Sequence, residues 1–394
     1  MPTPFSGTLN TNEFYNGLFN AYRLITTFSD GLDALDDSLA NKYRSDGGMY
    51  HDKSVFTDMD VLASRVWDPS DTNVLAPELT VAPVQQEIVT DKKRQIGLYS
   101  DTYLSRRAWL DATAFDAFNS VVQAQVGNTK RLYEQRLVDV FIGTESTSIG
   151  EQSQVIDVTT AVGAATGDEA HRIAAQTIAK GVADIVTKVK DSTRDFNDYE
   201  FVKAYNESDL DFIWNADVYN SILYTDLPTI YHKDELLKSG RVLPARYFGT
   251  KVTSSTTANG TTHRALQEYK LRTDASGNYS ATGTYLKNVF PGDLLPSGTP
   301  IVAPTTAETT AAWTTTYNGR GYTFTVYSTV HAYVENANIA CKIVHKNGVR
   351  YLSSFETSTE FWNPKNLTTN RYLTWLFAEP QHLANYPFIT VTLT

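Results

Sequence analysis

The chain has one cysteine, no long apolar run and no signature of a secreted protein. Because Cys341 is alone among 394 residues, no disulfide can form within the chain and no cysteine-rich metal site is present. This composition fits maturation in a reducing compartment, and the strand-like context of Cys341 predicts a small buried side chain. No stretch of about 18 apolar residues is present, so we expect no transmembrane helix. The polar start, Met1 to Asn20, predicts no secretory signal.

Basic residues are also in deficit. The chain holds 34 Lys and Arg against 44 Asp and Glu, a formal net charge of −10. A protein that grips the nucleic-acid backbone usually carries a basic patch or a high pI, so we expect no tight, direct binding to DNA. The length exceeds the roughly 250–300 residues over which a single core grows, and at least two subdomains are predicted.

Catalytic signatures are missing. The sequence Asp168-Glu169-Ala170-His171 spells a helicase motif, but the Gly-Lys pair of a phosphate-binding loop occurs nowhere. A helix start, where acids oppose the macrodipole, is the better interpretation. The histidines lack zinc-site spacing, and the pairs Asp36 with Asp37 and Asp58 with Asp60 are interpreted as solvated faces. We expect no enzyme, no bound metal and no cofactor.

Hydrophobic periodicity predicts two helices. The longer runs from about Asp111 to Ile142, with Asp111 as its cap, Gly127 as a candidate bend and Gly143 as the glycine that follows its end. At 1.5 Å per residue it would measure roughly 48 Å, and such a helix needs support along its whole length. The second runs from about Asp168 to Lys190, with Asp168 as its cap.

Strand signals dominate from Arg241 onward, so the fold class is α+β. Tyr322 to Ile343 is rich in β-forming residues, Asn347-Gly348 predicts a hairpin turn, and Phe388 to Leu393 predicts a closing strand. Before that point, Tyr199 to Tyr205 is predicted as a strand and Asp217 to Leu223 as a short helix.

A long hairpin arm is predicted at about 72–105. Val84 to Thr90 and Gln95 to Leu104 would form its strands, and 91–94 its charged tip. An isolated two-stranded hairpin is marginal in water, so we expect this one to rest on another subunit. The candidate contacts between subunits are the tip and the junction with the long helix: Asp91, Lys92, Lys93, Arg94, Arg106 and Arg107.

This order of elements resembles the Hong Kong 97 fold of the major capsid proteins of tailed double-stranded DNA bacteriophages. The stretches Lys342-Ile343-Val344-His345-Lys346-Asn347-Gly348 and Phe361-Trp362-Asn363-Pro364 are similar to capsid proteins of small short-tailed phages, the podoviruses. The resemblance implies an N-terminal arm and lead-in at 1–71, an E-loop at 72–108, a P-domain at 109–189 with its spine helix at about 111–142, an A-domain at 190–320, and strands that return to the P-domain at 321–394.

The resemblance also implies a function. Such subunits self-assemble through pentamers and hexamers into the icosahedral head, which encloses the genome without specific binding, in the cytoplasm of the bacterial host. The implied partners are other copies, a scaffolding protein, a portal and head-decoration proteins, with no membrane. The alternatives are a tail or receptor-binding β protein, a carbohydrate-active enzyme and an encapsulin-type nanocompartment. The long helix disfavours a tail fibre, and no carboxylate pair stands out as catalytic.

Overall fold

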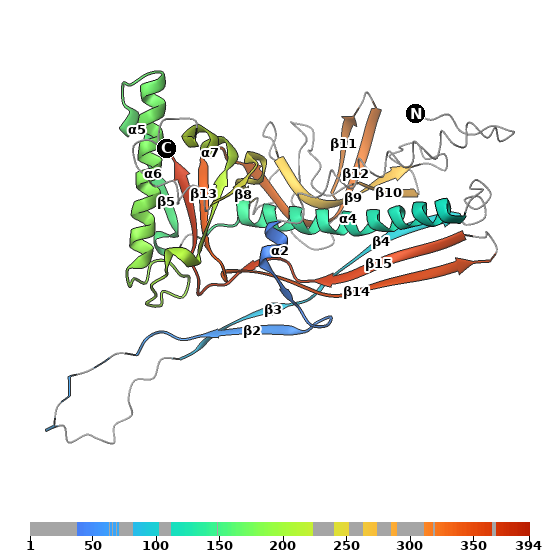
Figure 1. Cartoon of the computed structure of the whole chain (residues 1–394), viewed down its shortest axis with the longest axis horizontal. Coiled ribbons are helices and arrows are strands. Elements are labelled where there is room, and N and C mark those ends of the chain that lie inside the picture. The colour runs from blue at the N-terminus through green and yellow to red at the C-terminus, as the bar shows by residue number, and fades with distance from the viewer. Residues whose placement is uncertain are drawn as a thin grey trace. The chain divides into compact units, whose positions relative to one another are not determined.

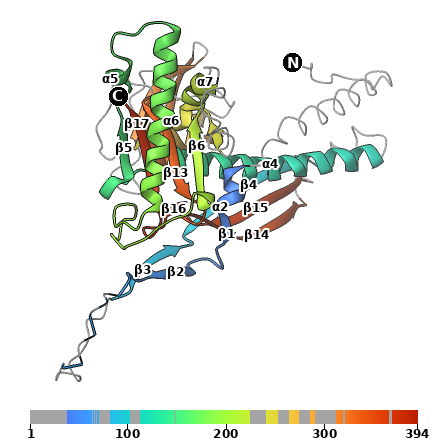
Figure 2. The ribbon, with the colours of Figure 1, turned by 60° about the vertical axis from the view of Figure 1, so that its left-hand side comes forward.

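The computed structural model forms two compact units that each combine distant parts of the chain (Figures 1 and 2). Unit 1 contains 1–52, 90–135 and 352–379, and unit 2 contains 53–89, 136–351 and 380–394. Both hold helices and strands, which confirms the α+β class. The structure describes residues 38–62, 64, 66–67, 69–70, 82–101, 112–147, 149–223, 240–251, 263–273, 285–289, 311–317, 320–364 and 368–394.

Unit 1 is built on a sheet in the order β1-β14-β15-β4, in which β15 pairs antiparallel with both neighbours. The helix α4 begins in this unit and packs its Tyr133 edge-on against Trp375 and Phe377 of β15, with ring centroids 6.3 and 6.0 Å apart. The elements are α2 (Leu39–Tyr43), β1 (Arg44–Asp46), β4 (Lys92–Asp101), α4 (Ala112–Thr144), β14 (Val349–Asn363) and β15 (Thr368–Phe377).

A buried ion network joins α4 to this sheet. Lys130 and Glu134, both on α4, are only 5% and 4% exposed. Lys130 forms an ion pair with Glu356 of β14, while Arg44 of β1 lies 3.4 Å from Glu134. Each buried charge therefore meets an opposite charge, which is the condition under which charges are tolerated away from water.

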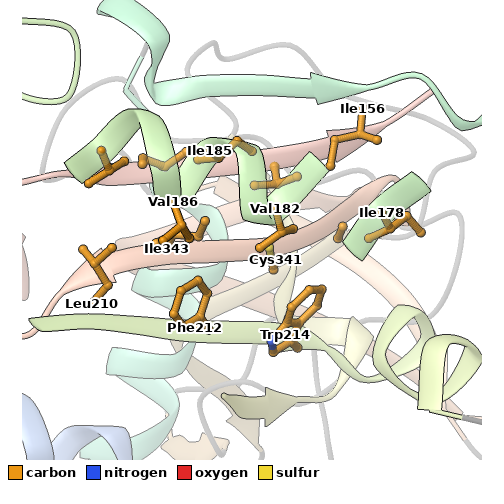
Figure 3. Close-up of a cluster of buried hydrophobic side chains, with 14 of the residues drawn as sticks. Ile156, Ile178, Val182, Ile185, Val186, Leu210, Phe212, Trp214, Cys341 and Ile343 are labelled. Atoms are coloured by element: carbon orange, nitrogen blue, oxygen red, sulfur yellow. The ribbon is translucent and has the colours of Figure 1, made fainter. Parts of the chain in front are cut away.

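Unit 2 holds a mixed five-stranded sheet in the order β5-β17-β13-β6-β7. Helix α6 lies over one face and points its apolar side chains at the strands, as Figure 3 shows for Val182 of α6, which faces Cys341 of β13. Together these side chains form a hydrophobic cluster, and all its members, including Trp214 and Ile343 of the strands, are almost fully buried. The elements are β5 (Ser153–Ile156), α5 (Val158–Val162), α6 (Asp168–Lys190), β6 (Leu210–Asn215), α7 (Ala216–Leu223), β7 (Arg241–Leu243), β13 (Ile339–His345) and β17 (Phe388–Leu393).

Unit 2 also carries a second sheet and a two-stranded ribbon. The second sheet has the order β10-β9-β12-β11, with β8 paired to β12, and the ribbon consists of β2 and β3. Within the described part of the chain, no helix is long and apolar enough to cross a membrane. The remaining strands are β2 (Lys53–Asp58), β3 (Val84–Val89), β8 (Gly249–Lys251), β9 (His263–Thr273), β10 (Tyr285–Val289), β11 (Ala311–Tyr317), β12 (Arg320–Glu335) and β16 (Gln381–His382).

The structure confirms both long helices and corrects details of their ends. Gly143 lies inside α4, not after it. Gly167, not Asp168, is the N-cap of α6, and Asp168 and Glu169 lie in the first turn, which confirms the helix-start interpretation of that motif. The short helix α7 and the closing strand β17 are also confirmed.

Two strand predictions are wrong. Tyr199 to Tyr205 forms no strand, since only a single bridge links Lys203 to Thr193. Asn347-Gly348 does form a tight turn, in which the Gly348 amide donates to the His345 carbonyl over 2.8 Å. The turn does not close a hairpin, however, because β13 and β14 enter different sheets.

Candidate assembly surface

The long hairpin exists, but the predicted strand pairing is wrong. Val84–Val89 pairs antiparallel with Lys53–Asp58, from Lys53 opposite Val89 to Asp58 opposite Val84. The strand that was predicted as its partner, β4, pairs with β15 instead. The hairpin is therefore Lys53–Val89, which we call the assembly hairpin, and its paired strands are β2 and β3 (Figure 2).

The predicted tip residues consequently do not lie at a tip. Asp91 is exposed between β3 and β4, and Lys92 Nζ lies 3.5 Å from both Asp91 and Glu379. Burial would lower the pKa of Lys92, but these two acids outweigh it and raise that pKa. Arg94 stacks on the Tyr133 ring at 3.9 Å, whereas Lys93 is exposed. Arg106 and Arg107 lie outside the described residues.

Two aspartates at the loop end of β2 hold the assembly hairpin to the rest of unit 2. Asp58 pairs with Lys203 at 2.9 Å and accepts a hydrogen bond from the Asn385 amide at 3.0 Å. Asp60 pairs with Arg194 at 2.7 Å. Their side chains are 19% and 12% exposed, so the interpretation of this pair as a solvated face is wrong.

A third contact holds β3. The Gln86 side chain donates to the His382 carbonyl over 2.8 Å and accepts from the Ala384 amide over 2.9 Å. We call Asp58, Asp60 and Gln86 the anchor. The anchor therefore holds β2 where the ladder stops, through Asp58 and Asp60, and holds β3 within the ladder, through Gln86.

The anchor is electrostatically sensitive to acid. Burial would raise the pKa of Asp58, but hydrogen bonds from Lys203 and Asn385 outweigh it and lower that pKa. The pKa of Asp60 is lowered first by the backbone amide of Val202 and then by Arg194. A carboxylate with a lowered folded pKa stabilises the fold above its unfolded pKa of about 3.8, and this contribution is lost as the pH falls through the folded value.

We therefore expect the assembly hairpin to loosen when the pH falls below about 3.8. At neutral pH, Asp60→Ala should increase hydrogen exchange of the Val202 amide, which donates to Asp60 over 2.9 Å. The control Asp60→Asn keeps an oxygen acceptor for that amide and should retain more of its protection. Equal exchange in all three chains at pH 6, or no change in the wild type on acidification, would contradict this role of the anchor.

The connection beyond the anchor exposes large apolar side chains. Val66 and Trp67 are 91% and 83% exposed, and Leu62, Val61 and Met59 are 64%, 58% and 46% exposed. A cluster of exposed apolar side chains in a short segment is typical of a protein–protein contact. We call these five residues, Met59, Val61, Leu62, Val66 and Trp67, the apolar segment.

Within the described ranges, neither a reactive thiol nor a metal-binding cluster accompanies this surface. Cys341 is fully buried, as predicted, and burial raises the pKa of its thiol to about 12, so the thiol stays protonated near neutral pH. No group of three or more His, Cys, Asp or Glu residues within these ranges could hold a metal ion.

Comparison with known proteins identifies the fold. No protein-family model and no curated protein sequence matches the chain. A chain in the capsid structure of Staphylococcus phage Andhra superposes with a TM-score of 0.57 at 8% identity, over 89% of this chain and 83% of that chain. A chain in the structure of the head fiber and inner core protein gp22 of native bacteriophage P68 gives 0.53 at 9% identity, with the same coverage. The chain therefore has an α+β fold of the Hong Kong 97 capsid type, as the resemblance implied.

Proposed function

We infer that the chain is a structural subunit that self-assembles into the icosahedral head of a tailed bacteriophage. The observation that carries this is the likeness to a chain of a phage capsid structure over 89% of this chain. The apolar segment supports it independently, because large apolar side chains exposed together are typical of a surface that another protein covers.

The E-loop of this subunit is the assembly hairpin, Lys53–Val89, rather than 72–108. The spine of the P-domain is α4, and the A-domain falls within 190–320, with strands returning to the P-domain from 321 onward. Among the candidate contact residues, Asp91 and Lys93 keep their proposed role between subunits because both are exposed. A podovirus origin and assembly in the host cytoplasm, with a scaffolding protein, a portal and decoration proteins, complete the proposal.

The subunit encloses the genome rather than binding it. A net charge of −10 repels the phosphate backbone, so a shell of such subunits would hold packed DNA without gripping it. Tight binding of duplex DNA by the folded chain at physiological salt would contradict this part of the proposal.

Assembly is tested directly by electron microscopy and size-exclusion chromatography of the purified chain. We expect shells, tubes or rings of subunits, and a chain that stays monomeric at every concentration and ionic strength would overturn the proposed function.

We expect the apolar segment to be one of the contacts on which assembly depends. The double variant Val66→Ser, Trp67→Ser should lose assembled particles, yet keep its free energy of unfolding within about 0.5 kcal/mol, because both side chains are largely exposed in the single chain. The control Val155→Ser changes a side chain that is 60% exposed on β5, and it should assemble like the wild type. Normal assembly of the double variant would show that the apolar segment is not a contact.

A further inference from the structure

A buried histidine closes the tight turn that follows β13. His345 is only 8% exposed, and its Nδ1 atom accepts a hydrogen bond from the Asn347 amide over 3.0 Å. Because a backbone amide can only donate, Nδ1 must present its lone pair, and the ring is neutral with its proton on Nε2. A second proton, added at Nδ1, would set two N–H donors against each other and break this hydrogen bond.

This turn supports the segment 381–387, which we call the anchor loop. The Leu383 amide of the loop donates to the Gly348 carbonyl of the turn over 2.7 Å, and the His345 amide donates to the carbonyl of the last loop residue over 3.3 Å. The His345 ring also stacks on the Tyr386 ring, with centroids 4.4 Å apart and planes inclined by 18°. Backbone hydrogen bonds and a ring stack therefore hold the anchor loop to the turn.

The anchor loop in turn holds both strands of the assembly hairpin. Gln86 of β3 forms its two hydrogen bonds with the backbone of this loop. The side-chain amide of Asn385, also in the loop, donates to Asp58 of β2 over 3.0 Å. Two of the three anchor residues therefore depend on the position of the loop, and the loop depends on the turn that His345 closes.

The surroundings of His345 favour the neutral ring. The titratable and charged groups that face it are Asp209, Asp211, Lys346, Arg350, Tyr205 and Tyr386. Burial is the largest influence and lowers the pKa of His345 from its usual 6.5, the lysine and the arginine act in the same direction, and the two aspartates oppose them. The unfolded chain therefore takes up a proton at a higher pH than the folded chain, and the turn loses stability as the pH falls from 6.5 toward the folded pKa.

A second histidine, inside the anchor loop, differs in its hydrogen bonding. His382 Nε2 lies 2.8 Å from the Tyr386 carbonyl oxygen, which can only accept, so this nitrogen carries the proton. Its Nδ1 lies 3.8 Å from an Asp198 oxygen, and a proton added there would face a carboxylate rather than an N–H donor. Protonation of His382 therefore breaks no hydrogen bond of its ring, whereas protonation of His345 breaks one.

We propose that His345 is an acid-sensitive latch, which holds the anchor loop against the assembly hairpin when its ring is neutral and releases the loop when its ring is protonated. The latch opens at a higher pH than the carboxylates of the anchor, which lose their contribution only below about 3.8. It operates within the single chain. Its consequence for assembly, a hairpin whose root loosens in mild acid, rests on the proposed function.

Hydrogen exchange of the purified chain between about pH 6.5 and 4.5 tests the latch. The Leu383 and Ala384 amides should lose protection, corrected for the intrinsic pH dependence of exchange, by at most about tenfold per pH unit, because one proton is taken up. His345→Asn keeps an oxygen acceptor for the Asn347 amide and does not titrate, so its protection should stay constant. The matched control His382→Gln keeps a side-chain donor and should lose protection as the wild type does.

Each outcome decides the inference. A loss of protection that persists in His345→Asn, or that disappears in His382→Gln, overturns it, because another group then carries the response to pH. Constant protection of the wild type down to pH 4.5 overturns it as well. NMR titration of the His345 ring in the wild type needs no variant, and a folded pKa at or above 6.5 would also contradict the latch. The proposed function is decided separately, by whether particles form at pH 7.

Discussion

Replacing Gly143 with alanine is expected to destabilise the protein, although the same substitution at Gly127 in the same helix should stabilise it. A Cβ on Gly143 would lie 2.1 Å from the Tyr247 carbonyl oxygen and 2.7 Å from the carbonyl carbon. Both distances are far inside van der Waals contact, and the obstacle is backbone. Tyr247 ends a 3-10 turn and precedes the fully buried Phe248, so the turn has little freedom to withdraw.

The two substitutions differ only in what the new methyl group meets. Overpacking of this kind costs about 1–3 kcal/mol or more, which outweighs the gain of about 1 kcal/mol from removing a helical glycine. At Gly127 nothing lies within 4 Å of the added Cβ, so Gly127→Ala should gain about 0.5–1 kcal/mol. Urea unfolding of the unassembled chain measures both changes, and shifts of the same sign would show that the approach of Tyr247 to α4 is not rigid.

The role of Gly143 illustrates what the sequence alone could and could not predict. The extents of α4 and α6 follow from the periodic spacing of their apolar residues, which is visible within each segment alone. Both helices were predicted to within two residues at each end. The reason for a glycine at 143 lies in Tyr247, about a hundred residues away, so a local rule interpreted it as the end of the helix.

The prediction of strand pairing was also wrong because the true partners are distant in the sequence. The prediction joined β3 to the next strand along the chain, yet β3 pairs with β2 across 59–83, and β4 pairs with β15. The sequence of β2 gave little help, because exposed and half-exposed positions alternate in the structure while polar and apolar residues do not alternate from Lys53 to Asp58. The anchor shows the limit most clearly, because the partners of Asp58 and Asp60 lie beyond residue 190 and no spacing rule connects them.

The second large loss of stability is expected on replacing a lysine that is buried in the unit 2 sheet. Lys342 has no exposed surface, and its Nζ donates to the Glu145 carbonyl over 2.7 Å and to the Thr390 hydroxyl over 2.8 Å. Glu145 directly follows α4, so this lysine hydrogen-bonds a carbonyl at the C-terminal end of that helix. Lys342→Ala removes both donors and leaves a cavity, and it should lower the free energy of unfolding by about 2–5 kcal/mol.

The pH dependence identifies the charge state of this lysine. Burial lowers its pKa from 10.5 to about 7, although Glu145 opposes the shift. A neutral amine has two N–H donors, and the structure supplies two acceptors. Between pH 7 and 10.5 the unfolded chain holds a proton that the folded chain has released, so the free energy of unfolding should rise with pH, by at most about 1.4 kcal/mol per unit.

The matched variant Lys342→Met isolates this contribution, because methionine is of similar length and does not titrate. Subtracting its unfolding free energy from that of the wild type cancels the tyrosines and other groups that ionise in the same range. The difference should climb from pH 7 toward pH 10 and be flat below pH 6. A difference that stays constant over the whole range would mean that Lys342 keeps its proton in the fold, held by the Glu145 carboxylate rather than neutralised by burial.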